Sequence, residues 1–397
     1  MQKTYFILLI LLTTVFCNYS FSQDIELIVI DQNSNLPIED VSVNYVNSND
    51  GTVSNSDGKF SVTRLEKILK ISHISYETLF VDVKKLSKGD TLRLNPNVVK
   101  LEEVTVNSFN LVKAINYVLE NYKKLYVNVP FEKDCILKET VTVNNEMKRF
   151  ILSNISWWDK SYFRKKNDIK LRLKYIDYSK NIPLGIFSDV PTLNTSSNSG
   201  FAVPSTIINT IYLNTFLNSF ISSTDDITSY VEKTTDEFID VHFETEWKKS
   251  GASSYQHIGN FIFDKKTKAI LNISFSTNQR GNIQKGIISK NNKESISETK
   301  SNNMRLHFSK TLNNRLSLKL YETEAKLDIT YDDKIYNAIF GNKIYVLNEK
   351  AVKKVNNVGL INLTKPIFES LPSNTVRSSN SILLNEMENE FIFEDKK

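Results

Sequence analysis

Short runs of alternating apolar and polar residues dominate the first hundred positions of the chain. Successive side chains of a strand point to opposite faces, so each run predicts a strand with one buried face. The Asp-Gly pairs at residues 50–51 and 57–58 favour tight turns between such strands. Six or seven short strands with no helical pattern predict a β-sandwich over residues 23–106. The runs themselves cover residues 25–29, 41–45, 59–62, 68–71, 79–83 and 91–94.

A mixed pattern follows over residues 107–380. Leu111, Ile115, Val118 and Tyr122 recur with helical spacing and predict an amphipathic helix that packs on a sheet. Residues 207–217 favour a second helix, whereas the Asn-, Lys- and Ser-rich residues 282–303 predict a long connection. The other runs are strand-like, so we expect an antiparallel β-rich α+β domain, either a half-barrel or an open barrel. These runs include residues 136–143, 150–157, 171–176, 230–233, 238–243, 260–264, 269–275, 305–308, 316–321, 325–331 and 343–346.

Residues 1–22 have the pattern of a signal peptide. Lys3 precedes an apolar run over residues 5–16, which is shorter than the ~20 residues that a transmembrane helix needs. Ser20 and Ser22 supply the small residues of a cleavage site. A lipoprotein signal at Cys17 is the alternative, although a bulky aromatic residue precedes that cysteine. We therefore expect export to the periplasm, the outer membrane or the medium, and no transmembrane span in the mature chain.

Composition narrows the class of protein. The 397 residues are 40% apolar and 24% charged, which indicates a folded chain. A net charge of +5 over this length is too weak to indicate nucleic-acid binding. Export would leave Cys135 as the one cysteine, so no internal disulfide is expected and the cores must hold without one. Cys135 itself is expected to be a small buried apolar residue.

Four segments of the first region resemble the carboxypeptidase regulatory-like domain. Residues 29–31, 36–43, 51–60 and 71–77 follow its order of a strand, "PI-x-x-A-x-V", "GT-x-T-x-x-x-G-x-F" and "I-G-Y". Val41 replaces the alanine of this pattern, and Ser75 replaces the glycine before Tyr76. The resemblance implies a transthyretin-like sandwich of about seven strands that contacts neighbouring parts of a protein. It does not imply peptidase activity, which belongs to a separate zinc domain.

A second resemblance concerns the larger region. Asn121-Tyr122, the strand at residues 135–140 and residues 259–270 look like the region that follows this sandwich in uncharacterised Bacteroidota envelope proteins. The last segment has the form "ID-x-x-T-x-A-I", which also recurs in LolA-like half-barrels that handle lipids. The resemblance implies an envelope protein and leaves a lipid carrier open as an alternative.

No catalytic or cofactor motif is present, and we expect neither a cofactor nor a metal. His242, Glu244 and Glu246 share one face of a predicted strand, where a solvated polar face is the preferred interpretation. A peptidase zinc site would need an H-x-x-E or H-E-x-x-H spacing. None of the four histidines provides it: His73, His242, His257 and His307.

Trp157, Trp158 and Tyr162 form the most ligand-like cluster, because aromatic side chains suit sugars and lipids. Packing within the sheet or at a domain interface is the alternative. Since adjacent strand residues point to opposite faces, we expect at most one of the two tryptophans to lie in the core. Residues 381–397 are expected to be a solvated acidic tail.

We therefore expect an exported, non-catalytic binding or interaction module. Its partner would be an envelope protein or a small ligand such as a lipid or glycan, and not nucleic acid. The alternatives are a LolA-like carrier of lipid or acyl chains and, third, a hydrolase with an unrecognised site. An apolar groove beneath the larger sheet would favour the carrier, and a filled core would favour a protein-contact role.

Overall fold

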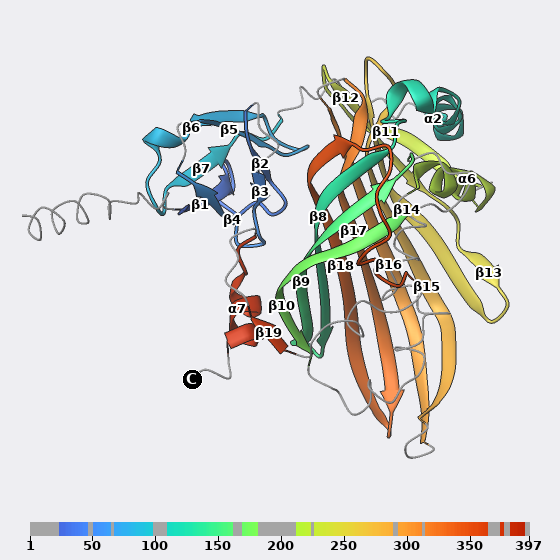
Figure 1. Ribbon diagram of the computed structural model, residues 1–397. Helices are drawn as coiled ribbons and strands as arrows, with labels where there is room; N and C mark the ends of the chain where they lie inside the picture. Colours follow the sequence, from blue (N-terminus) through green and yellow to red (C-terminus); the bar gives the residue numbers. More distant parts are fainter. Residues whose placement is uncertain are drawn as a thin grey trace, which may run out of the picture. The chain divides into compact units, whose positions relative to one another are not determined.

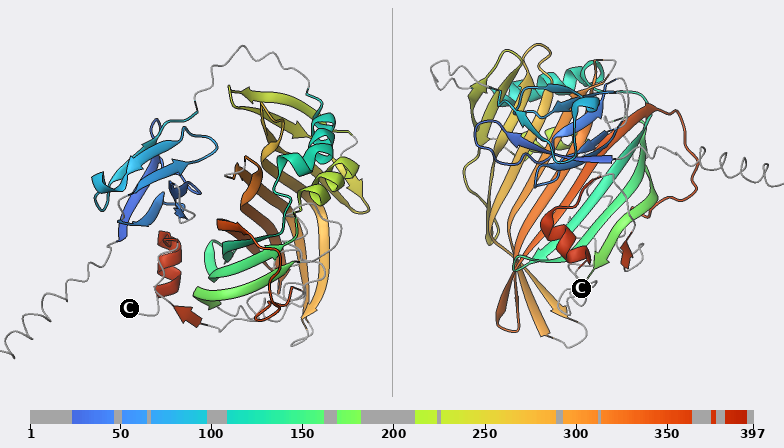
Figure 2. Two further views of the ribbon diagram at one scale, coloured as in Figure 1. Left: turned by 45° about the horizontal axis from the view of Figure 1, so that its top comes forward. Right: turned by 90° about the vertical axis from the view of Figure 1, so that its left-hand side faces the viewer.

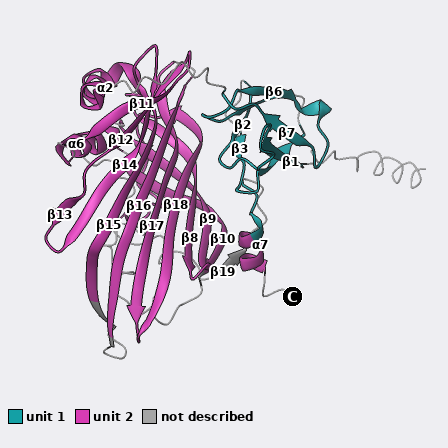
Figure 3. Cartoon of the chain, turned by 180° about the vertical axis from the view of Figure 1, so that it is seen from behind, with its two compact units in different colours: residues 1–98, 380–386 teal, residues 99–379, 387–397 magenta. Residues whose placement is uncertain are grey.

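The computed structural model describes residues 24–46, 51–64, 67–97, 109–161, 169–181, 212–223, 226–288, 293–311, 314–363, 374–376 and 382–393. These residues form two compact units, one within residues 1–98 and 380–386 and the other within residues 99–379 and 387–397 (Figure 3). The predicted signal peptide at residues 1–22 lies outside the described residues. Among the described helices, none is both long and apolar enough to cross a membrane.

Unit 1 is a seven-stranded β-sandwich, as the alternating pattern predicts. Its two sheets have the strand orders β4-β1-β7 and β3-β2-β5-β6. The buried core between them includes Leu27, Val43, Phe60 and Ile71. The strands are β1 (Asp24–Asp31), β2 (Ser42–Tyr45), β3 (Gly51–Val53), β4 (Lys59–Thr63), β5 (Ile68–Ser72), β6 (Leu79–Asp82) and β7 (Thr91–Leu94), with a short 3-10 helix η1 (Val83–Lys85) before β7.

Two positions explain the motifs of this sandwich. Gly58 has φ +70°, and an added Cβ would lie 2.3 Å from the Val29 carbonyl oxygen, so the turn into β4 requires glycine. The Ser54 hydroxyl donates to the Ile38 carbonyl at 2.7 Å and accepts from the Val41 amide at 2.9 Å. These two bonds hold the segment after β3 against the segment that precedes β2.

Unit 2 is built around one twelve-stranded sheet, so the expected antiparallel β-rich domain is confirmed (Figure 1). The strand order is β11-β12-β14-β15-β16-β17-β18-β8-β9-β10-β19, and β13 pairs with β14 off this path. The strands are β8 (Phe131–Val143), β9 (Glu146–Asp159), β10 (Lys170–Asn181), β11 (Thr228–Thr234), β12 (Phe238–Glu244), β13 (Lys248–Ser250), β14 (Ser253–Asp264), β15 (Ile270–Ile288), β16 (Lys293–Lys310), β17 (Leu316–Tyr331), β18 (Lys334–Ala351) and β19 (Asn374–Val376).

The sheet joins two runs of sequential neighbours. Strands β8 to β10 form one run, and the strands from β11 to β18 form the other, with β13 off the path. Pairing of β8 with β18 connects them, with Leu137 opposite Ile344, although about 200 residues of chain lie between these two strands. At the far end, β19 covers the edge of β10 over three residue pairs. Figure 2 shows how strongly the sheet of unit 2 curves and twists.

Two helices pack on one face of this sheet, which we call the inner face. They are α2 (Leu111–Leu125) and α6 (Leu213–Ser223). The stripe predicted for α2 is buried as expected, and its Asn110 side chain caps the helix by accepting from the Lys113 amide at 2.8 Å. Tyr126, just after α2, exchanges two bonds with the Ile270 backbone at 2.9 and 3.0 Å. Helices and strands together bury one large apolar cluster.

The "ID-x-x-T-x-A-I" segment is a structural hairpin between β14 and β15. The Asp264 carboxylate accepts from the Thr267 amide at 2.7 Å and from its hydroxyl at 2.9 Å. Lys268 adopts a positive φ of 61° in this turn. Together with an ion pair from Lys310 at 2.9 Å, these bonds hold the pKa of Asp264 below its ordinary value despite partial burial.

Two expectations about unit 2 are wrong. The polar residues 282–303 are not one long connection, because β15 continues to Ile288 and β16 begins at Lys293. Strands that face solvent tolerate polar residues on both faces, which hides them from a search for alternation. Residues 386–393 of the predicted acidic tail form a helix rather than a solvated segment. Helix α7 (Glu386–Phe393) contains the buried residues Glu388, Phe391 and Ile392.

Candidate functional site

The predicted aromatic pair lies near the end of β9, the third strand from one end of the large sheet. Trp157 opposes Lys133 of β8 and Leu171 of β10, whereas Trp158 opposes Glu132 and Lys170. Trp157 belongs to the apolar cluster that also contains α2 and α6, so it lies on the inner face. Trp158 lies on the opposite face, which we call the outer face.

The inner side of this region is closed by apolar packing. Trp157 is 1% exposed, and its ring meets Phe131 edge-on with centroids 5.7 Å apart. Cys135, two pairs along β8, is 1% exposed, as expected for a small apolar residue. Burial raises the pKa of the Cys135 thiol to about 12, so it stays protonated and unreactive at neutral pH.

One charged group penetrates this core. The Lys133 side chain is fully buried, and its ammonium lies 2.5 Å from a Glu349 carboxylate oxygen. It also donates to the Ser317 hydroxyl at 2.8 Å and to the Leu318 carbonyl at 3.1 Å. Burial lowers the pKa of Lys133, while the Glu349 carboxylate opposes that shift. Lys133 of β8 is therefore bonded to both β17 and β18.

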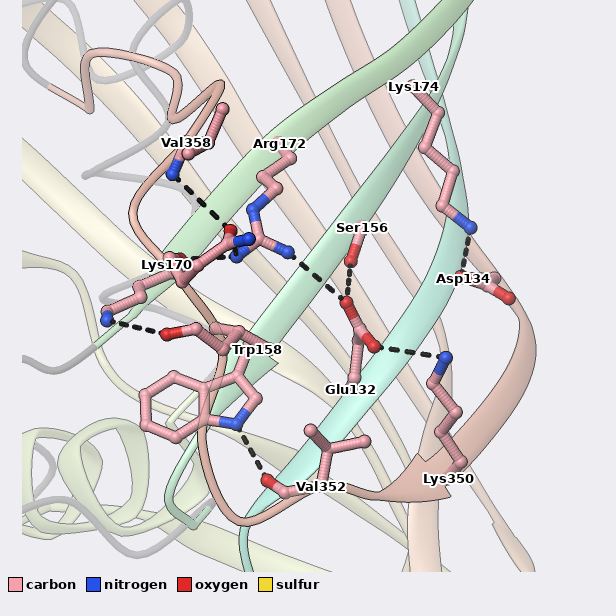
Figure 4. Close-up of polar contacts among 12 residues, drawn as sticks. Glu132, Asp134, Ser156, Trp158, Lys170, Arg172, Lys174, Lys350, Val352 and Val358 are labelled. Carbon is pink, nitrogen blue, oxygen red and sulfur yellow. Dashed lines mark hydrogen bonds and ion pairs between the residues drawn. The ribbon is translucent and has the colours of Figure 1, made fainter.

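The outer face of the same strands carries alternating charges (Figure 4). Glu132 accepts from the Ser156 hydroxyl at 2.6 Å and forms ion pairs with Lys350 at 3.1 Å and Arg172 at 3.6 Å. Burial alone would raise the pKa of Glu132, but bonds from Ser156 and Lys350 hold it below its ordinary value. Asp134 pairs with Lys174 one step further along the strands.

A segment that we call the strap, residues 352–361, lies against this outer face after β18. Its oxygens accept from three strand residues. The Trp158 indole Nε1 donates to the Val352 carbonyl at 2.8 Å, and Lys170 donates to the Asn357 side chain at 2.6 Å. Arg172 donates to the side-chain oxygen of Asn356 at 2.9 Å and to the carbonyl of the same residue. The strap therefore closes the outer face with hydrogen bonds.

The structure describes two of the three residues in the predicted aromatic cluster, Trp157 and Trp158. Only Trp157 belongs to the large apolar cluster, which agrees with the expectation of at most one tryptophan in the core. Trp158 is nevertheless buried, with 4% of its surface exposed. The strap is the physical reason, because it covers the face to which Trp158 points. Tyr162 lies outside the described residues. That the aromatic cluster binds a ligand stays a prediction.

The polar residues around Trp158 are not among the residues predicted for the site. Lys170, Arg172 and Lys174 stand at alternate positions of β10, a spacing that predicts a basic face of a strand. That signal could have been found in the sequence. The contribution of Asn356 and Asn357 could not, because nothing in the sequence shows where a loop after β18 lies.

The histidine and carboxylates of β12 do not gather. His242 lies 3.3 Å from the Asn260 side-chain oxygen, and β12 ends at Glu244, so Glu246 is not on the same strand face. Among the described residues, no group of three His, Cys, Asp or Glu side chains is placed to hold a metal ion.

Comparison with known proteins identifies unit 1. Residues 28–106 match the family model described as CarboxypepD_reg-like domain. The sandwich is therefore a carboxypeptidase regulatory-like domain, as its four motifs predict. This family is regulatory-like rather than catalytic. No curated protein matches the chain.

Two solved structures align with low similarity. A protein of unknown function from Bacteroides fragilis, inferred to be membrane-associated, is 9% identical over 82% of this chain and 97% of that chain, with a TM-score of 0.14. A loop-deletion mutant of OmpT, an outer membrane protein of Vibrio cholerae, is 10% identical over 54% and 97%, with a TM-score of 0.11. TM-scores this low do not indicate a shared fold, so neither structure bears on unit 2.

Proposed function

We propose that this protein is an exported, non-catalytic component of a Bacteroidota-like cell envelope that works as a binding or interaction module. The regulatory-like domain supports a role in contacts rather than catalysis. The signal-peptide pattern of residues 1–22 supports export to the periplasm or the outer membrane. Unit 2 would carry the binding function.

The observation that carries this proposal is the filled inner face of unit 2. Helices α2 and α6 occupy the face on which a carrier would hold an acyl chain. Their buried side chains interdigitate with aromatic residues from the strands, as when the Phe220 ring meets Phe243 edge-on at 5.1 Å. Close packing of this kind leaves the outer surfaces of the sheet for recognition.

One observation favours the alternative, a LolA-like carrier of lipid or acyl chains. A second apolar cluster on the inner face consists of residues from β8, β17 and β18 alone. Its members are at most 9% exposed, and they offer only apolar side chains, which suit an acyl chain. They are Val141, Val143, Ala325, Leu327, Ile329, Ala338 and Phe340.

Native mass spectrometry of the full chain purified from a periplasmic extract separates these functions. An interaction module should carry a protein partner or a polar ligand and no lipid. If the protein is an interaction module, Leu327→Asp in the second apolar cluster should leave the bound species unchanged. If the protein is a carrier, the same substitution should remove the bound lipid. Thr330→Asp, on the opposite face of β17, is the matched control. Co-purifying lipid that only Leu327→Asp removes would contradict the proposed function.

A further inference from the structure

We propose that the strap is a displaceable cover over a subsite for an anionic saccharide, formed by Trp158, Lys170 and Arg172 on the outer face. This inference rests on the proposed binding function and names a ligand class for it. It also explains why the segment that covers Trp158 is held by hydrogen bonds from strand side chains, while Val358 and Leu360 of this segment are exposed.

The donors define the subsite. Trp158, Lys170 and Arg172 offer one indole N–H, an ammonium and a guanidinium on neighbouring strands. Each donates to oxygens of the strap, at 2.8 Å from Trp158, 2.6 Å from Lys170 and 2.9 Å from Arg172. Lys170 also lies over the Trp158 ring, 5.4 Å from its centroid. The strap thus supplies carbonyl and amide oxygens where a ligand could supply hydroxyl and carboxylate oxygens.

The chemistry of these donors favours a carboxylated sugar. Guanidinium groups bind carboxylates through two parallel hydrogen bonds, and a charged acceptor binds more strongly than the neutral amide of Asn356. An indole ring suits the apolar face of a pyranose. Among the residues drawn in Figure 4, the cations Lys170, Arg172, Lys174 and Lys350 outnumber the carboxylates Glu132 and Asp134, so cations predominate beside the strap.

The middle of the strap is held less firmly than its two ends. Its ends are fixed by backbone bonds, from the Val352 amide to the Pro130 carbonyl at 3.0 Å and from the Ile361 amide to the Leu171 carbonyl at 2.9 Å. Between them, Val358 is 74% exposed and Leu360 is 40% exposed, so apolar burial contributes little there. Segments held by a few exposed hydrogen bonds open at a low free-energy cost.

Hydrogen exchange of the full chain tests the cover directly. In Asn356→Ala/Asn357→Ala, exchange of the strap amides should rise by about tenfold, because two side-chain acceptors of charged donors are lost. The matched control is Val358→Ala/Leu360→Ala, which shortens exposed strap side chains and should leave exchange unchanged. Equal protection in the two double variants would overturn the inference.

Calorimetry with trigalacturonate tests the ligand class, with neutral maltotriose as the comparison sugar. Asn356→Ala/Asn357→Ala should bind trigalacturonate about fivefold or more tightly than the wild type. In this variant less of the binding free energy is used to open the strap. Adding Arg172→Gln should abolish that binding, with the fold checked by circular dichroism. Binding that is equally tight for maltotriose, or no binding to the opened variant, would overturn the anionic-saccharide assignment.

These outcomes are separate from those of the proposed function. A strap that fails to open leaves native mass spectrometry free to detect a partner elsewhere on the chain. Conversely, co-purifying lipid that depends on Leu327 would reject the interaction module whatever the strap does.

Discussion

Trp157 and Trp158 are neighbours in sequence and almost equally buried, yet they are buried in different ways. Trp157 packs within an apolar cluster closed by two helices, next to Phe131. Trp158 is covered by the strap, which contacts it through one hydrogen bond from the indole to the Val352 carbonyl. The two tryptophans are therefore buried to a similar degree, one by apolar packing and the other by a hydrogen-bonded segment.

The difference shows that exposure alone does not separate a core from a covered site. Removing side chains from the inner face leaves cavities in close packing, which costs stability. Disturbing the outer face breaks hydrogen bonds that water or a ligand can replace, so the cost in stability is smaller. The experiments below measure that difference, beginning with the largest expected effect.

Thiol reactivity should differ most. At pH 8, native Cys135 should react with a thiol reagent at least about a thousandfold more slowly than a free cysteine, because its pKa of about 12 suppresses the thiolate. Asp134→Cys/Cys135→Ala moves the thiol by one residue to the outer face and should react readily. Slow reaction of both proteins would contradict the contrast between the faces.

The same pKa predicts a pH dependence of stability. Since burial raises the Cys135 pKa, the folded state keeps the proton that the unfolded state loses. The contribution of this thiol to the free energy of unfolding is complete below about pH 9 and is lost as pH rises towards about 12. Denaturation of the wild type and Cys135→Ala across this range isolates the effect.

Truncation of the two tryptophans should separate the faces by stability. Trp157→Ala should lower the free energy of unfolding by about 3–5 kcal/mol, because the helices cannot collapse into the space. Trp158→Ala should cost about 2 kcal/mol, because the strap can settle towards the strands. Urea denaturation measures both values, and equal losses would mean that the strap packs as firmly as the core.

The buried ion pair offers a third comparison. Glu349→Ala should cost about 3 kcal/mol, because it leaves the Lys133 ammonium buried without its carboxylate. Lys133→Met/Glu349→Leu should return to within about 1 kcal/mol of the wild type, since apolar residues can replace such a pair. Lys174→Ala, which breaks the partly exposed pair with Asp134, should cost less than about 1 kcal/mol.

The smallest effect is expected for Trp158→Phe. This variant keeps an aromatic ring and loses the hydrogen bond to Val352, which should cost about 1 kcal/mol. Hydrogen exchange should increase at the start of the strap and remain unchanged in β9. Faster exchange throughout β9 would show that the indole supports the sheet itself.

Unit 1 could be predicted almost completely from the sequence. Its strands are short, alternate cleanly and are separated by turns such as that at Gly58, where only glycine fits the backbone. Helix α2 was predictable for a similar reason, since Ile115 and Val118 repeat at helical spacing and face one core. In both cases local pattern and long-range packing favour the same structure.

Most strands of unit 2 could also be predicted, whereas the full length of some strands and their long-range pairing could not. Alternation cannot reveal the first half of β16, residues 293–303, where nearly all residues are polar although they pair with both neighbouring strands. It also cannot show that Trp158 is covered, because the strap reaches it from nearly 200 residues later in the chain. The candidate site was thus half predictable: β10 shows its basic face through Lys170 and Arg172, whereas its cover depends on tertiary structure.

The pairing of β8 with β18 has a consequence for how the chain folds. Because Leu137 must meet Ile344, the two halves of the large sheet remain separate until nearly all of unit 2 has been synthesised. Contacts this distant in sequence are slow to form, since a long loop must close before any bond compensates its lost entropy. Until then, β8 and β17 are unpaired edges of the kind that chaperones protect. A chain ending before β18 should therefore aggregate rather than fold into a smaller sheet.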